Sequence, residues 1–354
     1  MAVAVHRSCR DWTAWERHYM GMNGREWSII IPALNEEKHM DLCLQSLCNL
    51  GGEPRPEVIV VDNGSTDRTV AIAQSYRERL ALRVAVRGGA TVAGLRNWGA
   101  TTATGKYLAF LDADCLAPAS WLKEASEVLR ERPHIIAGAY YALPQTAGWP
   151  AKVWHARFHQ GKQGEVAYVP GGSMLMERGT FSKVGGFDGR LRSNEDSQLC
   201  SRARALGLQV VVVPSLAVTH LGAEKSLLHF AKRQRWHGSN ILSRSGLRGN
   251  RRAICLAAYT LLCLFSLAVC APSGKPVFVA TGLLGLLLPP AWMGLQPRKG
   301  VPARQALPLV LLLLVYAVVR AGVLPVAAFR ACKQTLSHRH EQSEMREDGR
   351  ALRT

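Results

Sequence analysis

The sequence lacks the paired cysteines of a disulfide framework or a zinc site. Its nine cysteines are an odd number, they are scattered, and no two stand at CxxC spacing. Cys255, Cys263 and Cys270 lie inside an apolar run. This usage is typical of reduced, unpaired sulfur on the cytosolic side, so neither a zinc site nor a disulfide scaffold is expected.

Glycine motifs that cradle phosphates are missing as well. No GxGxxG follows the first apolar run, and GxxxxGK(S/T) occurs nowhere in the chain. Those motifs hold a dinucleotide or a nucleoside triphosphate on backbone N–H groups at the start of a helix. Dinucleotide-binding and P-loop chemistry are therefore not indicated.

Acidic residues are few, with 26 Asp and Glu against 44 Lys and Arg, and the formal net charge is +18. Much of the basic excess flanks the apolar C-terminal third, at Arg244, Arg248, Arg251, Arg252, Arg298, Lys299, Arg304 and Arg330. Basic residues beside long apolar runs are typical of a membrane face. We therefore expect a lipid bilayer, and no nucleic acid, as the partner of these charges.

The first residues lack an apolar core. Arg7 and Arg10 are followed by no apolar run, so no cleavable signal peptide is indicated. Residues 1–26 show no steady period and are predicted to form a peripheral or surface-lying arm.

From residue 27 onward, short apolar runs alternate with amphipathic stretches. Strands are predicted over 27–32, 58–61, 82–86 and 107–111, with helices over 35–47 and 67–79, around 95–100, and over 118–132. This alternation predicts an α/β fold, a parallel sheet with helices on both faces. Beyond it we expect strands over 134–142, 210–213 and 216–219, a helix over 195–206, and irregular structure over 143–168.

Polar side chains follow three of the predicted strands. Asn35 follows the first, Asp62 the second, and Asp112 with Asp114 the fourth. Ligands of open α/β sheets bind at the carboxyl ends of strands, and residues i and i+2 of an extended segment point the same way. The strand ends therefore fit a nucleotide site with a hard cation at the two carboxylates. A turn or cap role stays open for each residue, and for Asp112 before the helix that starts near Pro118.

Four motifs carry a resemblance to a known family. They are IIIPALNEE, VIVVDNGSTD, GLRNWGATTATGKYLAFLDADC and PGGSMLMERGTFSKVGGFDGRLRSNEDSQLCSRARALG. In this order, over roughly residues 27–240, the chain resembles the inverting nucleotide-sugar glycosyltransferases of family 2, which have the GT-A fold. The resemblance implies a Rossmann-like, mostly parallel sheet, a nucleotide-diphosphate sugar donor, and Mg²⁺ or Mn²⁺ as cofactor.

The resemblance also implies roles for individual residues. The nucleotide-sugar set is Pro32, Ala33, Asn35, Asp62, Asn63, Arg96, Asp112 and Asp114. Pro32, Asn35 and Asp62 would hold the base and ribose. Asp112 and Asp114 would form the DxD motif, with Asp114 the principal metal ligand. Gly171 and Gly172 would lie beside the acceptor and the donor sugar.

Two acidic residues, Glu195 and Asp196, open the helix predicted over 195–206, behind the candidate caps Ser193 and Asn194. The helix dipole favours negative charge in a first turn, which alone would explain both. In sugar transfer, however, the acceptor hydroxyl must lose a proton as it attacks the anomeric carbon. The resemblance assigns that base to Asp196 and an acceptor contact to Glu195.

Three later side chains are candidates near the metal and the phosphates. His220, at the end of a predicted strand, is either a surface residue or, as a neutral imidazole, a third metal ligand. The following segment resembles the QxxRW signature of processive members, but Gln234 directly precedes Arg235, so a processive synthase is not indicated. Arg233 and Arg235 stay candidates as partners of the diphosphate.

Three apolar segments, 253–271, 276–295 and 306–329, close the chain. Each approaches the roughly 20 residues that cross a bilayer. The first two form a tight hairpin whose flanking basic groups place both outer ends in the cytosol. The third contains Arg320 and precedes a basic tail, so it either spans against the charge rule or lies in the interface. We expect a span with Arg320 facing protein.

Together these observations predict an arm over 1–26, a GT-A domain over 27–245, a membrane region over 246–330 and a polar tail over 331–354. The predicted protein is a multi-pass enzyme of the inner membrane whose catalytic domain faces the cytoplasm, a metal-dependent inverting glycosyltransferase with a lipid-linked or glycan acceptor. A sugar nucleotidyltransferase stays open, although Ala33–Glu36 lacks its Gly-rich, basic phosphate loop. A catalytically inactive membrane scaffold also stays open.

Overall fold

The computed structural model describes residues 26–51, 55–238, 251–270, 272, 275–296 and 303–351, without the side chains of 252, 303 and 330–351. The predicted arm, except Glu26, and the side chains of the predicted tail lie outside the described residues.

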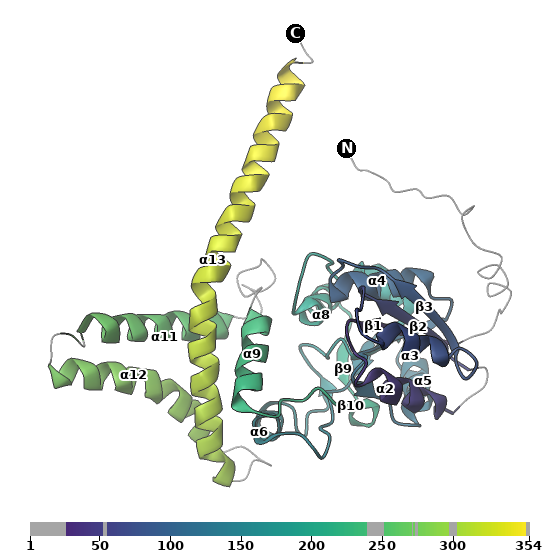
Figure 1. Ribbon diagram of the computed structural model, residues 1–354, viewed down its shortest axis with the longest axis horizontal. Coiled ribbons are helices and arrows are strands. Elements are labelled where there is room, and N and C mark those ends of the chain that lie inside the picture. Colours follow the sequence, from purple (N-terminus) through teal and green to yellow (C-terminus); the bar gives the residue numbers. More distant parts are fainter. Residues whose placement is uncertain are drawn as a thin grey trace.

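The core of the molecule is an eight-stranded sheet with the order β3-β2-β1-β4-β8-β6-β9-β7 (Figure 1). Its first half is parallel and consists of β1 (Trp27–Ala33), β2 (Glu57–Asp62), β3 (Ala81–Val86) and β4 (Tyr107–Leu111). The helices between these strands are α2 (Met40–Cys48), α3 (Thr69–Ser75) and α4 (Val92–Thr102). The predicted α/β arrangement is confirmed. β1, β2 and β4 are buried over their whole length, and for this reason their sequences are mostly apolar runs.

The second half of the sheet is mixed. β8 (Ser173–Glu177) lies between β4 and β6 (Ile136–Gly138) and runs antiparallel to both. β9 (Val210–Val212) is parallel to β6, and β7 (Gly164–Glu165) is antiparallel to β9. The sequence did not predict β8. It brings the turn before Ser173 to the carboxyl end of β4, since Ser173 pairs with Leu111.

The helices cover both faces of the sheet, and alternate residues of β1 enter opposite layers. Ile29 and Ile31 pack with side chains of α2 and of α5 (Trp121–Glu131), whereas Ile30 packs with those of α4 and of α8 (Glu195–Ala205). The short α7 (Arg178–Val184) lies in the second layer.

Two sequence predictions need correction. The stretch 143–168 is not irregular throughout, because it contains α6 (Trp149–Phe158), with a proline in its first turn where the missing N–H costs nothing. The strand predicted over 216–219 is instead a 3₁₀ turn (Pro214–Leu216) followed by the two-residue β10 (Thr219–His220). β10 pairs antiparallel with β5 (Cys115–Leu116), which follows β4 directly.

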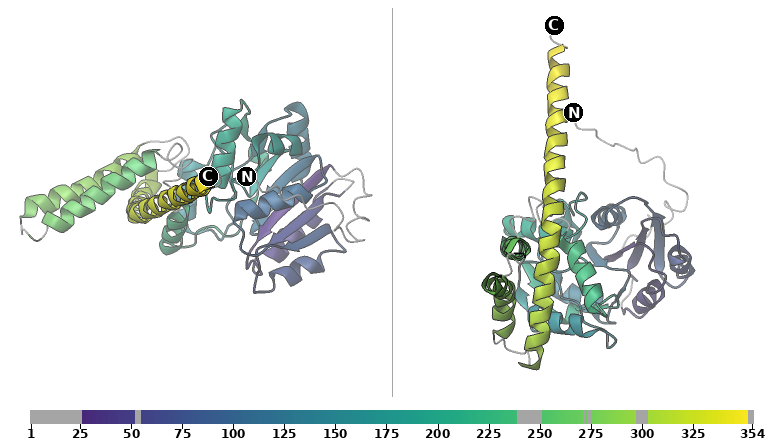
Figure 2. Two further views of the ribbon diagram at one scale, coloured as in Figure 1. Left: turned by 90° about the horizontal axis from the view of Figure 1, so that it is seen from above. Right: turned by 60° about the vertical axis from the view of Figure 1, so that its left-hand side comes forward.

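The C-terminal third is helical. It comprises α9 (Leu227–Gly238), α11 (Arg251–Cys270), α12 (Pro276–Leu295) and α13 (Ala306–Ala351). Among the described residues, three segments are long and apolar enough to cross a membrane: Ala253–Cys270, Pro276–Leu295 and Ala306–Phe329. In Figure 1 and Figure 2, the α11–α12 hairpin projects away from the sheet. α13 crosses the hairpin at the end that lies nearest to the sheet domain.

Candidate active site

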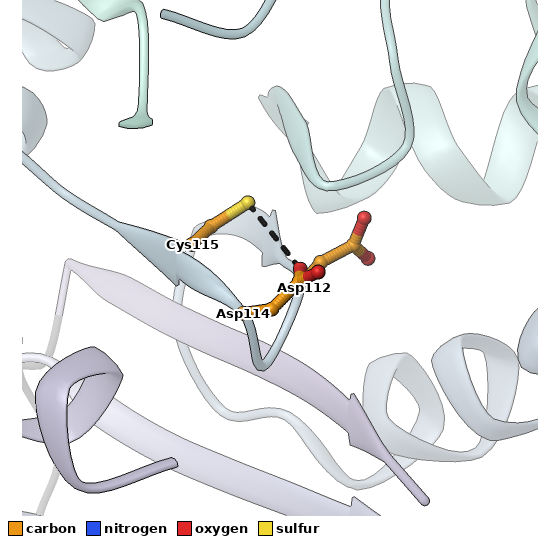
Figure 3. Close-up of side chains that lie close together, drawn as sticks. All are labelled: Asp112, Asp114 and Cys115. Atoms are coloured by element: carbon orange, nitrogen blue, oxygen red, sulfur yellow. Dashed lines mark hydrogen bonds between the residues drawn. The ribbon is translucent and has the colours of Figure 1, made fainter. Parts of the chain in front are cut away.

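Two carboxylates and a thiol cluster where β4 ends. Ligand atoms of Asp112, Asp114 and Cys115 lie within 4.8 Å of one another. Figure 3 shows the Asp114 side chain turned toward Cys115, whose Sγ is 3.8 Å from Asp114 Oδ1, while Asp112 points away from the thiol. Burial raises the pKa of Cys115 well above its usual value, so this side chain is a neutral thiol. The two aspartates are therefore the candidate ion ligands in this cluster.

Asp114 is held by the β5–β10 pair. His220 lies opposite Cys115 in the antiparallel register, and its Nε2 is 3.1 Å from Asp114 Oδ2. Burial by itself would raise the pKa of Asp114, but the hydrogen bond from His220 and the charges of His220 and Arg233 outweigh it and lower the pKa. Asp114 is accordingly an ionised carboxylate at neutral pH. The structure thus brings His220 and Arg233 to the second aspartate of the DxD pair.

Asp112 is tied to the other acidic pair through a buried arginine. Arg96 Nη2 donates to Asp112 Oδ1 at 2.6 Å, and Arg96 Nη1 donates to Glu195 Oε1 at 2.6 Å. Tyr141 Oη donates to Asp112 Oδ2 at 2.9 Å. The side chain of Asp112 therefore faces the strand ends. Asp112 does not cap α5, whose N-cap is Ser120, but its backbone carbonyl accepts a hydrogen bond from Cys115 N in the turn after β4.

Glycines are required where backbone passes over these side chains. A Cβ on Gly172 would collide with the carboxylate of Asp112, and one on Gly171 would lie 2.7 Å from Arg96 Nη1. A Cβ on Gly222 would likewise collide with Asp114. Gly171 and Gly172, which the sequence analysis placed beside the sugars, thus pack directly on the charged groups.

Asp196 contacts the Gly171–Gly172 turn. Its Oδ2 accepts a hydrogen bond from Gly171 N at 3.1 Å, and its Oδ1 accepts one from Ser197 N at 2.6 Å. Removal of water around the carboxyl and the neighbouring charge of Glu195 raise the pKa of Asp196 to about 7. The side chain of Asp196 is half-buried, so a proton-accepting group with a pKa near neutrality borders the same turn as Asp112.

The residues expected near the base and ribose anchor the loops after β1 and β2. Asp62 is fully buried, and its Oδ2 accepts hydrogen bonds from Gly64 N and Ser65 N, both at 2.8 Å. Asn35, at φ 55°, accepts from Thr66 N at 2.9 Å. The bond between Asn35 and Thr66 links the loop after β1 to the loop after β2. Both loops follow the strand ends at which Pro32 and Ala33 of β1 are the parallel-sheet partners of Val61 and Asp62 of β2. Asn63 exchanges two hydrogen bonds of 3.0 Å with Ala90, in the loop between β3 and α4.

The structure places the two arginines predicted to bind the diphosphate on different sides of α9, and it adds Tyr141 to the candidate site. Arg233 Nη2 lies 3.5 Å from His220 Nε2, whereas the exposed Arg235 is two residues further along α9 and hence on another side of the helix. Tyr141, which the sequence did not single out, bonds Asp112 and stacks on His220 with ring centroids 4.8 Å apart. It follows a short strand in a stretch with no motif, so no sequence signal pointed to it.

The carboxylates of Asp112 and Asp114 fit a divalent cation such as Mg²⁺ or Mn²⁺. Both ions prefer carboxylate oxygens as ligands. The lowered pKa keeps Asp114 ionised, and some of the lone pairs of its carboxylate accept no hydrogen bond from the described protein groups, so they could bind the ion. The neutral, soft thiol of Cys115 is a poor ligand for such an ion.

Protein-family comparison matches residues 28–185 to "Glycosyl transferase family 2" and residues 107–326 to "Glycosyl transferase family group 2". A probable glycosyltransferase, YdaM of Bacillus subtilis, is 24% identical over 253 residues, which is 63% of this chain and 60% of the relative. Validoxylamine A glucosyltransferase of Streptomyces hygroscopicus is 39% identical over 93 residues, 25% of this chain. The match spans only 20% of that relative's length.

Solved structures share the fold. The mannosyltransferase PcManGT of Pyrobaculum calidifontis superimposes with a TM-score of 0.56 at 19% identity, over 84% of this chain and 88% of the neighbour. S. aureus TarS 1-349 gives a TM-score of 0.50 at 19% identity, over 84% and 90% of the two chains. The expected GT-A fold is confirmed. Since the second family model covers most of the chain, this protein belongs to the family 2 glycosyltransferases.

Proposed function

We propose that this chain transfers a sugar from a nucleotide-diphosphate sugar to an acceptor at the membrane surface, with inversion and with a divalent cation. The observation that carries the proposal is that Asp112 and Asp196 both contact the Gly171–Gly172 turn, while Asp114 lies beside Asp112 where β4 ends. The related fold of PcManGT was solved with GDP-Man and Mn²⁺, and we propose ligands of the same two classes here.

In the proposed reaction, Asp196 accepts the proton of the acceptor hydroxyl as its oxygen attacks the anomeric carbon. The new bond joins that oxygen to the anomeric carbon, and the bond to the phosphate oxygen breaks. The electron pair leaves with the nucleoside diphosphate, on the face opposite the attack, so the configuration inverts. A divalent cation at Asp114 and Asp112 supplies neutralisation of the leaving diphosphate.

The other charged groups orient these two carboxyl pairs. Arg96 spans from Asp112 to Glu195 and thereby sets the distance between the metal side and the acceptor side of the site. Glu195 keeps one buried oxygen, Oε2, without a hydrogen-bond partner among the described residues. We assign that oxygen to the acceptor. Arg233, beside His220, is placed for the diphosphate.

Donor screening and product analysis test the proposal. Purified protein is heated with a panel of nucleotide sugars with and without Mn²⁺, because a bound donor raises the melting temperature. The best donor is then incubated with membrane lipid extract. Release of a nucleoside diphosphate is the expected result. In a parallel reaction with a nucleoside triphosphate and a sugar 1-phosphate, release of pyrophosphate would identify a nucleotidyltransferase instead. Donor binding without release of a product in either reaction would indicate an inactive scaffold.

The proposed location is the inner membrane, with the catalytic domain facing the cytoplasm. Support comes from the three apolar helices and from the basic residues that flank the first two. An acceptor that is lipid-linked, or a glycan held at that surface, would be within reach of a site anchored there.

A further inference from the structure

The α11–α12 hairpin has the composition and the exposed surface of a bilayer-spanning pair. No charged residue occurs in 253–270 or 276–295. Large apolar side chains are exposed on both helices, at Leu262, Phe265, Val269, Val277, Leu284, Leu288 and Trp292. Each helix has 20 residues, which at about 1.5 Å per residue matches the hydrocarbon core. Outside its contact with α13, this surface requires a hydrocarbon environment.

α13 does not run along the hairpin. Figure 1 and both views of Figure 2 show α13 crossing the α11–α12 pair steeply, near the end of the hairpin that adjoins the catalytic domain. The contact of Gly294 with Val310 fixes this crossing, since a Cβ on Gly294 would lie 2.6 Å from Val310 Cγ2. If the hairpin stands along the bilayer normal, α13 lies along the surface of the bilayer.

One side of α13 is covered by the catalytic domain. Leu309, Leu312 and Leu313 are buried in a cluster with Phe230 of α9 and Val153 of α6. Further along, Arg320 donates to Gln234 of α9 at 3.3 Å and lies 5.0 Å from the ring of Tyr316. The one charged residue between 306 and 329 therefore faces protein.

The other side of α13 is an exposed apolar stripe. It consists of Leu307, Leu311, Val318, Val326 and Phe329. Their spacing places them on one face of the helix, away from Leu309 and Leu313. A helix with protein on one side and bare apolar side chains on the other suits the boundary between headgroups and acyl chains.

α9 runs beside α13 (Figure 1) and covers its protein-facing side, with Phe230 in the shared cluster. Its exposed residues Leu228, Lys232, Arg235 and Trp236 lie on the opposite side of α9 from Phe230. They therefore face away from α13 and take no part in its apolar stripe. Arg233, on another side of α9, points to the candidate metal site.

We infer that α13 is a membrane-plane helix: Ala306–Phe329 lies along the surface of the bilayer on the catalytic side, with its exposed apolar stripe in the acyl boundary. The chain then crosses the bilayer twice, and residues 331–354 stay on the side of the catalytic domain. This replaces the expectation of a third span and removes its conflict with the basic tail. The inference rests on the membrane location proposed above.

Topology reporters on the full chain test it. One reporter is fused after Thr354, and in a second protein the same reporter is inserted between Gly274 and Lys275, in the hairpin connection. We expect the hairpin reporter on the far side of the membrane and the C-terminal reporter on the side of the catalytic domain. A C-terminal reporter on the far side would overturn the inference. A hairpin reporter on the catalytic side would overturn the membrane location itself, so the two failures are distinguishable.

Depth measurements separate a membrane-plane helix from a helix that dips into the bilayer and returns. A nitroxide-bearing unnatural residue is placed singly at 307, 318 or 329 in the full chain, in vesicles containing phosphatidylglycerol. Equal, shallow depths at the three positions are expected, with a label at 284 of α12 as the deep reference. A label at 318 that lies as deep as the reference would contradict the inference.

Discussion

At the scale of single residues, the site depends on two carboxyl groups in different electrostatic surroundings. Asp114, beside His220 and Arg233, has a lowered pKa and suits a cation. Asp196 is desolvated and lies beside Glu195, so its pKa is raised to about 7, which suits proton transfer. In the proposed mechanism, these different surroundings would give the two carboxyl groups separate roles.

Asp196→Asn is expected to lower the rate of transfer by about a hundredfold or more, because the side chain keeps its size but no longer accepts the proton. Nucleotide-sugar binding should stay within about twofold, since Asp196 contacts the Gly171 amide and not the β4 carboxylates. The measurements are kcat from nucleoside diphosphate release and Kd from calorimetry. Near-normal turnover would remove Asp196 from the mechanism.

The pKa of Asp196 also predicts the acidic side of the pH profile. The base must be ionised, so kcat/KM should be constant above about pH 7 and fall about tenfold per pH unit below it. The residual rate of Asp196→Asn should lack this decline. A wild-type profile that stays flat down to pH 5 would assign the proton transfer to another group.

Asp114→Ala is expected to abolish the part of nucleotide binding that depends on Mn²⁺, because it removes the ionised ligand of the pair. Titrations of wild type and variant with the nucleoside diphosphate, with and without Mn²⁺, measure this. Cys115→Ser serves as the matched control, since a neutral thiol at this position should contribute little. Equal curves for Asp114→Ala and wild type in Mn²⁺ would rule out the metal site.

At the scale of elements, short strands and one helix assemble the site and join it to the membrane region. β8 and β10 bring Gly172 and His220 to the end of β4, although neither strand has a strong sequence pattern. α9 packs Phe230 against α13 on one side and turns Arg233 toward His220 on another. The position of the site relative to α13 is therefore set mainly by α9.

Phe230→Ala should destabilise the junction of α9, α6 and α13 by about 3–5 kcal/mol, since a fully buried aromatic side chain is lost from a packed cluster. Thermal unfolding of the full chain in detergent measures the loss. Leu228→Ala, exposed on the same helix, is the control and should change the free energy of unfolding by less than about 0.5 kcal/mol. Equal losses for the two variants would show that the cluster does not form.

At the scale of the whole molecule, the catalytic domain and the membrane region are one packed unit. α13 contacts α6, α9, α11 and α12, so the long helix connects the sheet domain to the hairpin. The domain boundary predicted between residues 245 and 246 lies outside the described residues. α9, which precedes it, packs against α13, which follows it.

Membrane attachment should resist both salt and alkaline carbonate. Attachment by basic residues alone would be released by about 1 M salt, which shortens the Debye length to about 3 Å, whereas an inserted hairpin is held by apolar burial. The full chain is expected in the membrane pellet after both washes, with a known peripheral protein as control. Release by salt would show that the hairpin is not inserted.

The sequence by itself determined the α/β fold, the family and the site-forming motifs. A strand that is buried on both faces must be a nearly continuous apolar run, which is why the sequence predicted β1, β2 and β4. The polar residues that follow such strands lie at the edge of the sheet where ligands bind, so Asp62, Asp112 and Asp114 could be identified from each strand separately. The apolar helices were readable for the same reason, because length and composition decide whether a segment suits a bilayer.

The tertiary structure decided what depends on contacts between distant segments. The pairing of β8 with β4, the bonds of Tyr141 and Arg96 to Asp112, and the burial that raises the pKa of Asp196 leave no periodic trace in the sequence. The crossing of α13 over the α11–α12 hairpin belongs to the same class. A span and a membrane-plane helix can have the same composition, and the inference that α13 lies in the membrane plane depends on this crossing, which includes the contact of Gly294 with Val310.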